Sequence, residues 1–141
     1  IVGKVSLIHS VDSFELAKEI SKVSIHKKII SNILVQVNIG KEDNKFGIYY
    51  EEAEKLITQT RNLGNINIKG LMTIPPICEN PEDINKFFSL MEKKFIDIKN
   101  KKLDNVNMDY LSMGMSSDYI QAIEAGSNII RIGSALFGTR D

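Results

Sequence analysis

The sequence predicts an α/β fold, namely an incomplete (β/α)8 TIM barrel with about five consecutive parallel βα units. Strand-like apolar segments alternate with amphipathic helical segments, at the spacing of βαβ units rather than of hairpins. A complete barrel takes about 250 residues for eight units, so the 141 residues have a barrel's repeat length without its closure. The competing architecture is an open doubly wound sheet, and it is disfavoured because the dinucleotide-binding motif G-x-G-x-x-G does not follow the first strand.

The predicted strands are near-continuous runs of apolar and β-branched residues, as expected of parallel strands that are covered on both faces. They are residues 5–11, 32–39, 66–74, 108–113 and 128–133.

Each predicted strand is followed by a helical segment. The first helix should be capped by Asp12, with Leu16, Ile20 and Val23 on one face. The second carries apolar residues at helical spacing between positions 53 and 63.

The remaining helices follow the later strands. Asn80 followed by Pro81 predicts the start of a long helix that ends at about Asn100. A short helix over residues 116–126 and a helical turn over 134–138 complete the pattern.

Composition narrows the class of protein. At roughly 150 residues per domain, a chain of 141 residues is expected to form a single domain over residues 1–141. Eighteen basic and eighteen acidic residues cancel, which disfavours nucleic-acid binding through a basic surface. No apolar run is long enough to span a membrane and no signal peptide is visible, so we expect no membrane partner and a cytoplasmic location.

Two further features bear on class and completeness. Cys78 is the single cysteine, so an internal disulfide is excluded, and with only two histidines no zinc site of four Cys and His ligands can form. The chain begins IVGK without an initiator Met, which leaves open that it is a piece of a longer protein.

Two candidate anion-binding turns follow the last two strands, where the active sites of barrels lie. In the first turn the strand ends at Ser112, passes Gly114 and enters a helix at Ser116, so hydroxyl and backbone N–H groups converge. In the second turn Gly133 is followed by Ser134 at the start of a helical turn. Two such turns on consecutive strands predict a phosphate site.

Each of these features also has a purely structural interpretation, with the glycines serving tight turns and the serines a strand end and a helix cap. Arg131 is harder to explain in that way, because an arginine in so apolar a strand needs an internal carboxylate or a ligand atom beside it. We expect structural roles for His9 and His26, and prefer a loop charge for Lys45 over a side chain that faces the strand ends.

Four segments, taken together, resemble the pyridoxal phosphate homeostasis proteins. They are IHSVDS at 8–13, VQVNIGKEDNKFG at 35–47, LMTIP at 71–75 and SMGMSSDYIQAIEAGSNIIRIGSALFG at 112–138. The resemblance implies the barrel of the alanine racemase N-terminal domain (fold type III), of which this chain would be the C-terminal part. It implies binding of pyridoxal 5′-phosphate (PLP), a role in vitamin B6 and amino-acid homeostasis, and no established turnover of its own.

The resemblance also assigns the cofactor-binding residues. They are Ser112, Gly114, Met115 and Ser116 on the phosphate side, the backbone of Gly133 and Ser134, and Arg131 facing the pyridine nitrogen. A guanidinium beside that nitrogen disfavours its protonation. An unprotonated ring is a poorer electron sink, which suits a carrier or a racemase better than a transaminase.

The lysine that anchors PLP as a Schiff base in this family has no counterpart in a matching context, since Lys4 precedes the first strand and Lys45 lies in a loop. We therefore expect the isolated chain to bind PLP weakly and without Schiff-base absorbance. Five units leave two unpaired sheet edges, so we expect self-association or pairing with the missing N-terminal part.

Two alternatives stay open. One is an amino-acid racemase relative, which needs a lysine and a tyrosine as opposed acid and base and a further β domain. The other is a phosphosugar- or nucleotide-binding barrel fragment without PLP.

Overall fold

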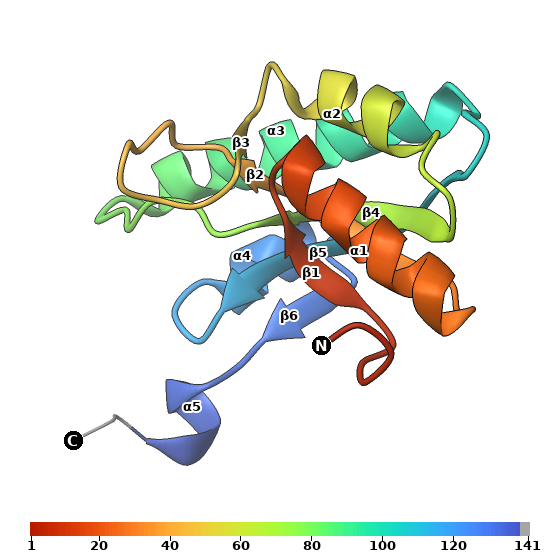
Figure 1. Cartoon of the computed structure of the whole chain (residues 1–141). Helices are drawn as coiled ribbons and strands as arrows, with labels where there is room; N and C mark the ends of the chain where they lie inside the picture. The colour runs from red at the N-terminus through yellow and green to blue at the C-terminus, as the bar shows by residue number, and fades with distance from the viewer. Residues whose placement is uncertain (139–141) are drawn as a thin grey trace.

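The computed structural model describes residues 1–138, and its centre is a curved parallel sheet (Figure 1). Five strands follow the order β1 (Ile8–Val11), β2 (Ser31–Asn38), β4 (Ile66–Thr73), β5 (Val106–Met115) and β6 (Ile129–Arg131). The two-residue strand β3 (Ile48–Tyr49), which the sequence did not predict, pairs with β2. Every pairing is parallel, which confirms the predicted repeat of βα units.

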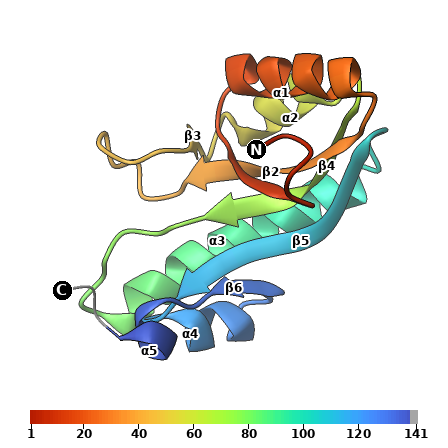
Figure 2. The ribbon, with the colours of Figure 1, turned by 60° about the horizontal axis from the view of Figure 1, so that its bottom comes forward.

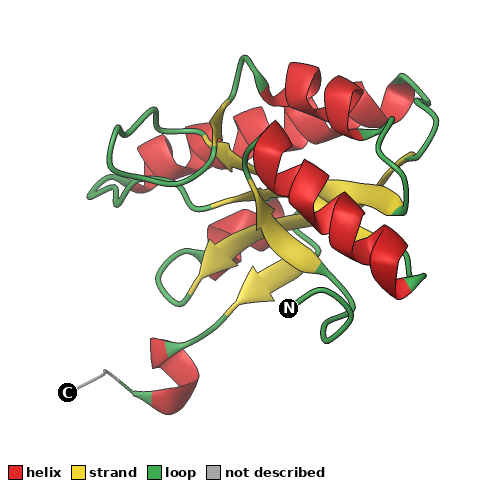
Figure 3. Ribbon diagram, viewed as in Figure 1, coloured by secondary structure: helices red, strands yellow, loops and turns green. Residues whose placement is uncertain are grey.

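The helices alternate with the strands along the chain (Figure 3). They are α1 (Phe14–Lys27), α2 (Ala53–Thr60), α3 (Pro81–Asn100), α4 (Tyr119–Glu124) and α5 (Ser134–Phe137). Figure 2 shows α1 and α2 beside β2, and α3 and α4 beside β5. None of the helices in residues 1–138 combines the length and the apolar character that a membrane crossing requires.

The hydrophobic core lies between the sheet and the helices. Alternate residues of β2, namely Ile33, Val35 and Val37, join Ile57 of α2 and Phe88 of α3 in one buried cluster. Leu34 and Met72 are buried too, but they lie outside that cluster, on the opposite face of the sheet. The second face is thus buried in part, since Tyr110, which alternates with the core residue Leu111, is 40% exposed.

The sheet is strongly curled, and one side-chain contact shows by how much. His9 Nδ1 of β1 lies 3.1 Å from Ser112 Oγ of β5, although β2 and β4 lie between these two strands. In a flat sheet three strand spacings would separate them by roughly 14 Å. The sheet therefore bends around its concave face as an incomplete barrel does, with β1 and β6 as its ends.

The first helix departs from the prediction at its start. The cap is Ser13, whose extended backbone (φ −147°, ψ 156°) lets its Oγ accept the N–H of Leu16 at 3.2 Å. Asp12 is not the cap, because its carboxylate instead accepts the N–H of Gly47 at 3.2 Å. Of the three apolar residues expected on one face of this helix, Ile20 is buried and Leu16 is 39% exposed.

The buried face of α1 is displaced toward small and polar residues. It consists of Ala17, Ile20, Ser21 and Ser24. Ser24 Oγ donates to the carbonyl of Ile20 at 2.7 Å, so the hydroxyl is satisfied within the helix. A serine whose hydroxyl has a partner within the helix can therefore be buried on this face at little cost.

The long helix α3 begins as predicted. Asn80 has an extended backbone, its side-chain oxygen accepts the N–H of Glu82 at 3.0 Å, and Pro81 occupies the first turn. The segment 74–79, which connects β4 to the start of α3, lies at the end of the sheet where the site is found.

Candidate functional site

Two strand-to-helix turns, one after β5 and one after β6, lie side by side. Ser116 Oγ in the first turn accepts the backbone N–H of Gly133 at 3.1 Å and of Ala135 at 3.2 Å in the second. One hydroxyl therefore links the two predicted anion-binding turns.

A pocket of about 560 Å³ opens beside this link. One wall is formed by the two turns, through Met115, Ser116, Ser117, Asp118, Gly133 and Ser134. The facing wall comes from the segment between β4 and α3, together with Lys45. Four of the predicted site residues, Met115, Ser116, Gly133 and Ser134, thus share one pocket.

The two glycines of the site differ in their surroundings. A Cβ added at Gly133 would meet nothing within 4 Å, so this residue borders open space. A Cβ added at Gly114 would lie 2.6 Å from Cβ of Ala122, and Gly114 has a φ of +98°. Gly114 therefore lets α4 pack against β5, whereas Gly133 leaves room in the pocket.

The remaining two predicted residues form a separate cluster on the concave face. Arg131 Nη1 donates to Ser112 Oγ at 2.5 Å, and Nη2 donates to the carbonyl oxygen of Thr73 at 2.9 Å. Within the chain, two neutral oxygens rather than a carboxylate accept its protons, and contact of Arg131 with a ligand atom stays a prediction. A guanidinium has further N–H donors, which stay available to a ligand.

The charges around this cluster follow from burial. Burial lowers the pKa of Arg131, and the nearby carboxylate of Asp118 acts in the opposite direction. Burial also lowers the pKa of His9, and the positive charge of Arg131 lowers it further. Asp118 is itself held in place, because its Oδ1 accepts the N–H of Met115 at 2.6 Å.

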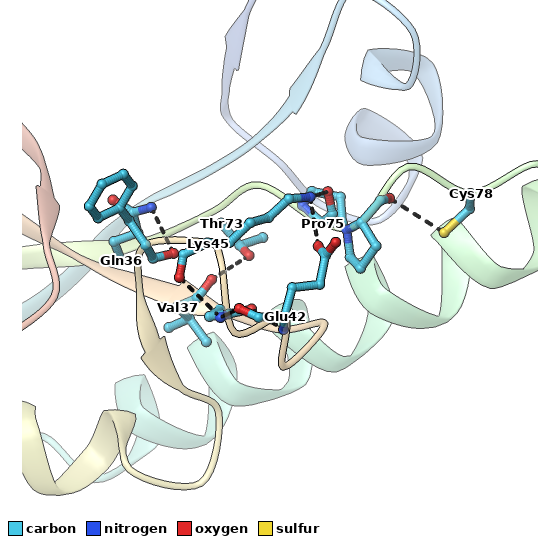
Figure 4. A network of polar contacts seen from close by, with 10 residues as sticks. Gln36, Val37, Glu42, Lys45, Thr73, Pro75 and Cys78 are labelled. Atoms are coloured by element: carbon cyan, nitrogen blue, oxygen red, sulfur yellow. Dashed lines mark hydrogen bonds and ion pairs between the residues drawn. The ribbon is translucent and has the colours of Figure 1, made fainter.

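The loop between β2 and β3 is tied to the end of the sheet by polar contacts (Figure 4). Asn38 accepts the N–H of Glu42 at 3.2 Å and donates to the carbonyl oxygens of Glu42 and Lys45 at 2.8 and 3.3 Å.

This loop directs Lys45 toward the pocket. Lys45 Nζ lies 2.6 Å from the Glu42 carboxylate and donates to the carbonyl of Pro75 at 3.4 Å (Figure 4). The preference for a mere loop charge is therefore wrong, since Lys45 faces the strand ends.

Sequence reasoning missed three residues at this site, namely His9, Thr73 and Lys45. His9 contacts Ser112, and Thr73 supplies one acceptor to Arg131 through its carbonyl while its Oγ1 donates to the carbonyl of Val37 at 2.6 Å. The signal that could have found His9 and Thr73 is their position near the carboxyl ends of apolar strands.

A curled parallel βα sheet with its pocket at the carboxyl ends of the strands defines a protein of the (β/α) barrel class. The chain belongs to the family "alanine racemase, N-terminal domain", whose family model matches residues 2–141. The predicted fold and the predicted resemblance are thereby confirmed.

Relatives with curated names include pyridoxal phosphate homeostasis proteins from several bacteria. The one from Aquifex aeolicus is 43% identical over 140 residues, which cover 99% of this chain and 60% of that protein. The one from Pasteurella multocida is 36% identical over 134 residues, covering 95% of this chain and 57% of that protein. The chain thus spans less than two thirds of the length of these relatives.

A solved structure shows the same fold with the cofactor present. PipY of Synechococcus elongatus PCC7942, with PLP bound, superimposes with a TM-score of 0.87 at 27% identity. The match covers 97% of this chain and 63% of PipY.

Proposed function

We propose that this chain binds pyridoxal 5′-phosphate at the carboxyl ends of β5 and β6, and that it serves vitamin B6 and amino-acid homeostasis by holding the cofactor rather than by turnover. The observation that carries the proposal is the Ser116 link, which brings both turns to one pocket. The names of the relatives and the PLP bound to PipY support it.

The pocket wall fits a phosphate group. Within residues 1–138, the backbone N–H groups of Ser117 and Ser134 make no hydrogen bond, and both residues line the pocket. Gly133 borders open space there, and the hydroxyls of Ser116 and Ser134 add polar atoms at the same place. Free N–H and hydroxyl groups are the donors that phosphate oxygens accept from.

The charged lining argues for modest affinity. Lys45 is the pocket's cation, but it is paired with Glu42, and the lining also contains Glu79 and Asp118. Net charge therefore does not attract a dianion to this chain. Recognition would rest on directional donors, which agrees with the prediction that the isolated chain binds PLP weakly.

In the proposed complex Arg131 would donate to the pyridine nitrogen. Its guanidinium is oriented by Ser112 and Thr73, and because it has no acceptor it favours an unprotonated ring nitrogen. When bound, the cofactor supplies an aldehyde that reacts with amines. The contribution of this chain is to bind and orient.

The proposal is tested by calorimetric titration of the chain with pyridoxine 5′-phosphate, which keeps the ring and the phosphate but lacks the aldehyde. We expect binding that weakens when the phosphate is removed, and little binding of ribose 5-phosphate. Equal or tighter binding of ribose 5-phosphate would favour the phosphosugar alternative and refute the proposal.

A second measurement separates a carrier from an enzyme. We expect no racemisation of L-alanine by the chain with added PLP, measured by chiral chromatography. Measurable racemisation that is lost in Arg131→Leu would instead support the racemase alternative.

Location and association stay predictions. Among the strands of residues 1–138, β1 and β6 each pair on one side, and Leu136 and Phe137 beyond β6 are 70% and 86% exposed. Unpaired strands and exposed apolar side chains favour association, either with a second copy or with further βα units. We retain the cytoplasmic location as an expectation from the sequence.

A further inference from the structure

We propose that His9 is a positioning residue for Arg131. In this role its neutral imidazole, with Nδ1 unprotonated, accepts the hydroxyl proton of Ser112 and so turns the Ser112 oxygen toward the guanidinium. The hydrogen-bond part of the inference stands on the structure of this chain alone. Its consequence for a ligand rests on the proposed function.

The argument begins with the protons of the cluster. Arg131 can only donate, so Ser112 Oγ, 2.5 Å from Nη1, must accept. Ser112 then has its single hydroxyl proton left to donate. His9 Nδ1 lies 3.1 Å from the same oxygen, and an unprotonated Nδ1 accepts that proton. In this arrangement each donor among the three contacting atoms, Nη1, Oγ and Nδ1, faces an acceptor.

The other protonation states leave a group unsatisfied. A protonated Nδ1 would donate to the same oxygen as Arg131, and the hydroxyl proton of the fully buried Ser112 would lose its acceptor. A buried polar group without a partner is costly. A doubly protonated His9 would also place a second positive charge beside Arg131.

The charges that face the cluster agree with a neutral imidazole. Arg131 of β6 is the charged group that acts on His9, and it lowers the pKa of the imidazole in addition to burial. The carboxylate of Asp118, from the turn after β5, acts on Arg131. Neither the geometry nor the charge therefore favours an imidazolium at position 9.

The hydroxyl direction matters because, within residues 1–138, two hydrogen bonds hold the Arg131 side chain. Thr73 holds Nη2 through a backbone carbonyl, and the Thr73 side chain is itself fixed to β2 through Val37. The Ser112 hydroxyl is the rotatable one of the two acceptors. His9 limits that rotation, and so fixes the plane in which the remaining guanidinium donors face a ligand.

The first test is nitrogen-15 NMR of the histidine rings of the 141-residue chain. The chain has two histidines, so a His26→Gln variant assigns the signals. We expect His9 to show an unprotonated Nδ1 and a protonated Nε2, and to titrate at lower pH in the folded chain than in the same chain in urea. An Nδ1-protonated ring, or a midpoint that is not lowered on folding, would overturn the proposal.

The second test asks whether His9 positions Arg131, and it compares His9→Leu with His9→Asn. Asparagine keeps a neutral acceptor close to the position of Nδ1, whereas leucine has none. We expect the Arg131 side-chain N–H resonances to shift or broaden in His9→Leu and to stay near those of the unchanged chain in His9→Asn. Unshifted resonances in His9→Leu would contradict the positioning role.

The third test uses two ligands that differ at the ring nitrogen, pyridoxine 5′-phosphate and 3-hydroxybenzyl phosphate. Loss of one hydrogen bond predicts a roughly threefold to tenfold weaker affinity of His9→Leu for the first. Its affinity for the second should be unchanged. Equal losses for both would show a general structural effect and refute the role toward the ring.

The outcomes separate this inference from the proposed function. If the unchanged chain binds neither ligand, the proposed function fails, and the NMR measurements still decide whether His9 orients Ser112 and Arg131.

Discussion

Alanine substitution at two glycines, Gly133 and Gly114, should separate ligand contact from folding. At Gly133 the new methyl group meets no protein atom within 4 Å, so the free energy of unfolding should change by less than about 1 kcal/mol. At Gly114 the methyl group would lie 2.6 Å from Cβ of Ala122, on a backbone with φ of +98°. Strain and overpacking together predict a loss of at least about 2 kcal/mol there.

Ligand binding, in contrast to stability, should be affected by the substitution at Gly133. If the phosphate lies against Gly133, a methyl group there takes up ligand space, which costs about 1 to 3 kcal/mol, or roughly 5-fold to 150-fold in the Kd of pyridoxine 5′-phosphate. Urea denaturation followed by circular dichroism gives the stabilities, and calorimetric titration gives the Kd. A Gly133→Ala chain that is folded and binds the ligand with unchanged Kd would refute the placement of the phosphate.

The remaining predictions concern Ser116, His9, Lys45 and the sheet edges. Ser116→Ala should lower stability by about 1 kcal/mol in urea denaturation, because two N–H groups lose their acceptor; an unchanged midpoint would count against the link. Since the pKa of His9 is lowered on folding from about 6.5, its contribution to stability is complete above that pH and is lost as the pH falls through the lower folded value. His9→Asn should remove this part of the pH dependence in denaturation between pH 7.5 and 5, and an identical slope in both chains would contradict it. After PLP addition and borohydride reduction, intact mass should show no stoichiometric adduct on the chain; a strong adduct that is lost in Lys45→Ala would disprove the absence of the anchoring lysine. Light scattering after gel filtration should show association of the isolated chain, and a stable monomer would contradict the expectation that the unpaired strand edges promote association.

Local signals in the sequence were sufficient to predict most of the helices and strands. The Asn80 and Pro81 pair predicted the start of α3, because capping depends only on neighbours in the chain. At α1 the same reasoning chose Asp12, one residue too early. The carboxylate of Asp12 is engaged by Gly47, a contact across 35 residues that a local pattern cannot reveal.

The candidate site was predictable in its turns but not in its interior. Ser116 and Gly133 follow strands directly, so topology alone placed them at one end of the sheet. His9 and Ser112 are 103 residues apart, and their contact depends on the curl of the sheet, which hydrophobic periodicity does not encode. For Arg131 the cost of burial predicted that it has a partner, but the neutral acceptors emerge only from the packing of three strands.

The Ser116 hydroxyl gives the backbone amides of Gly133 and Ala135 an oxygen acceptor within the chain. A ligand oxygen that took over those amides would replace one acceptor with another, so the exchange would release little free energy. Discrimination among phosphorylated molecules must then come from the amides of Ser117 and Ser134 and from the part of the ligand that reaches Arg131. Because Ser116 is an acceptor within the chain itself, the N–H groups of Gly133 and Ala135 do not depend on a ligand for a hydrogen-bond partner.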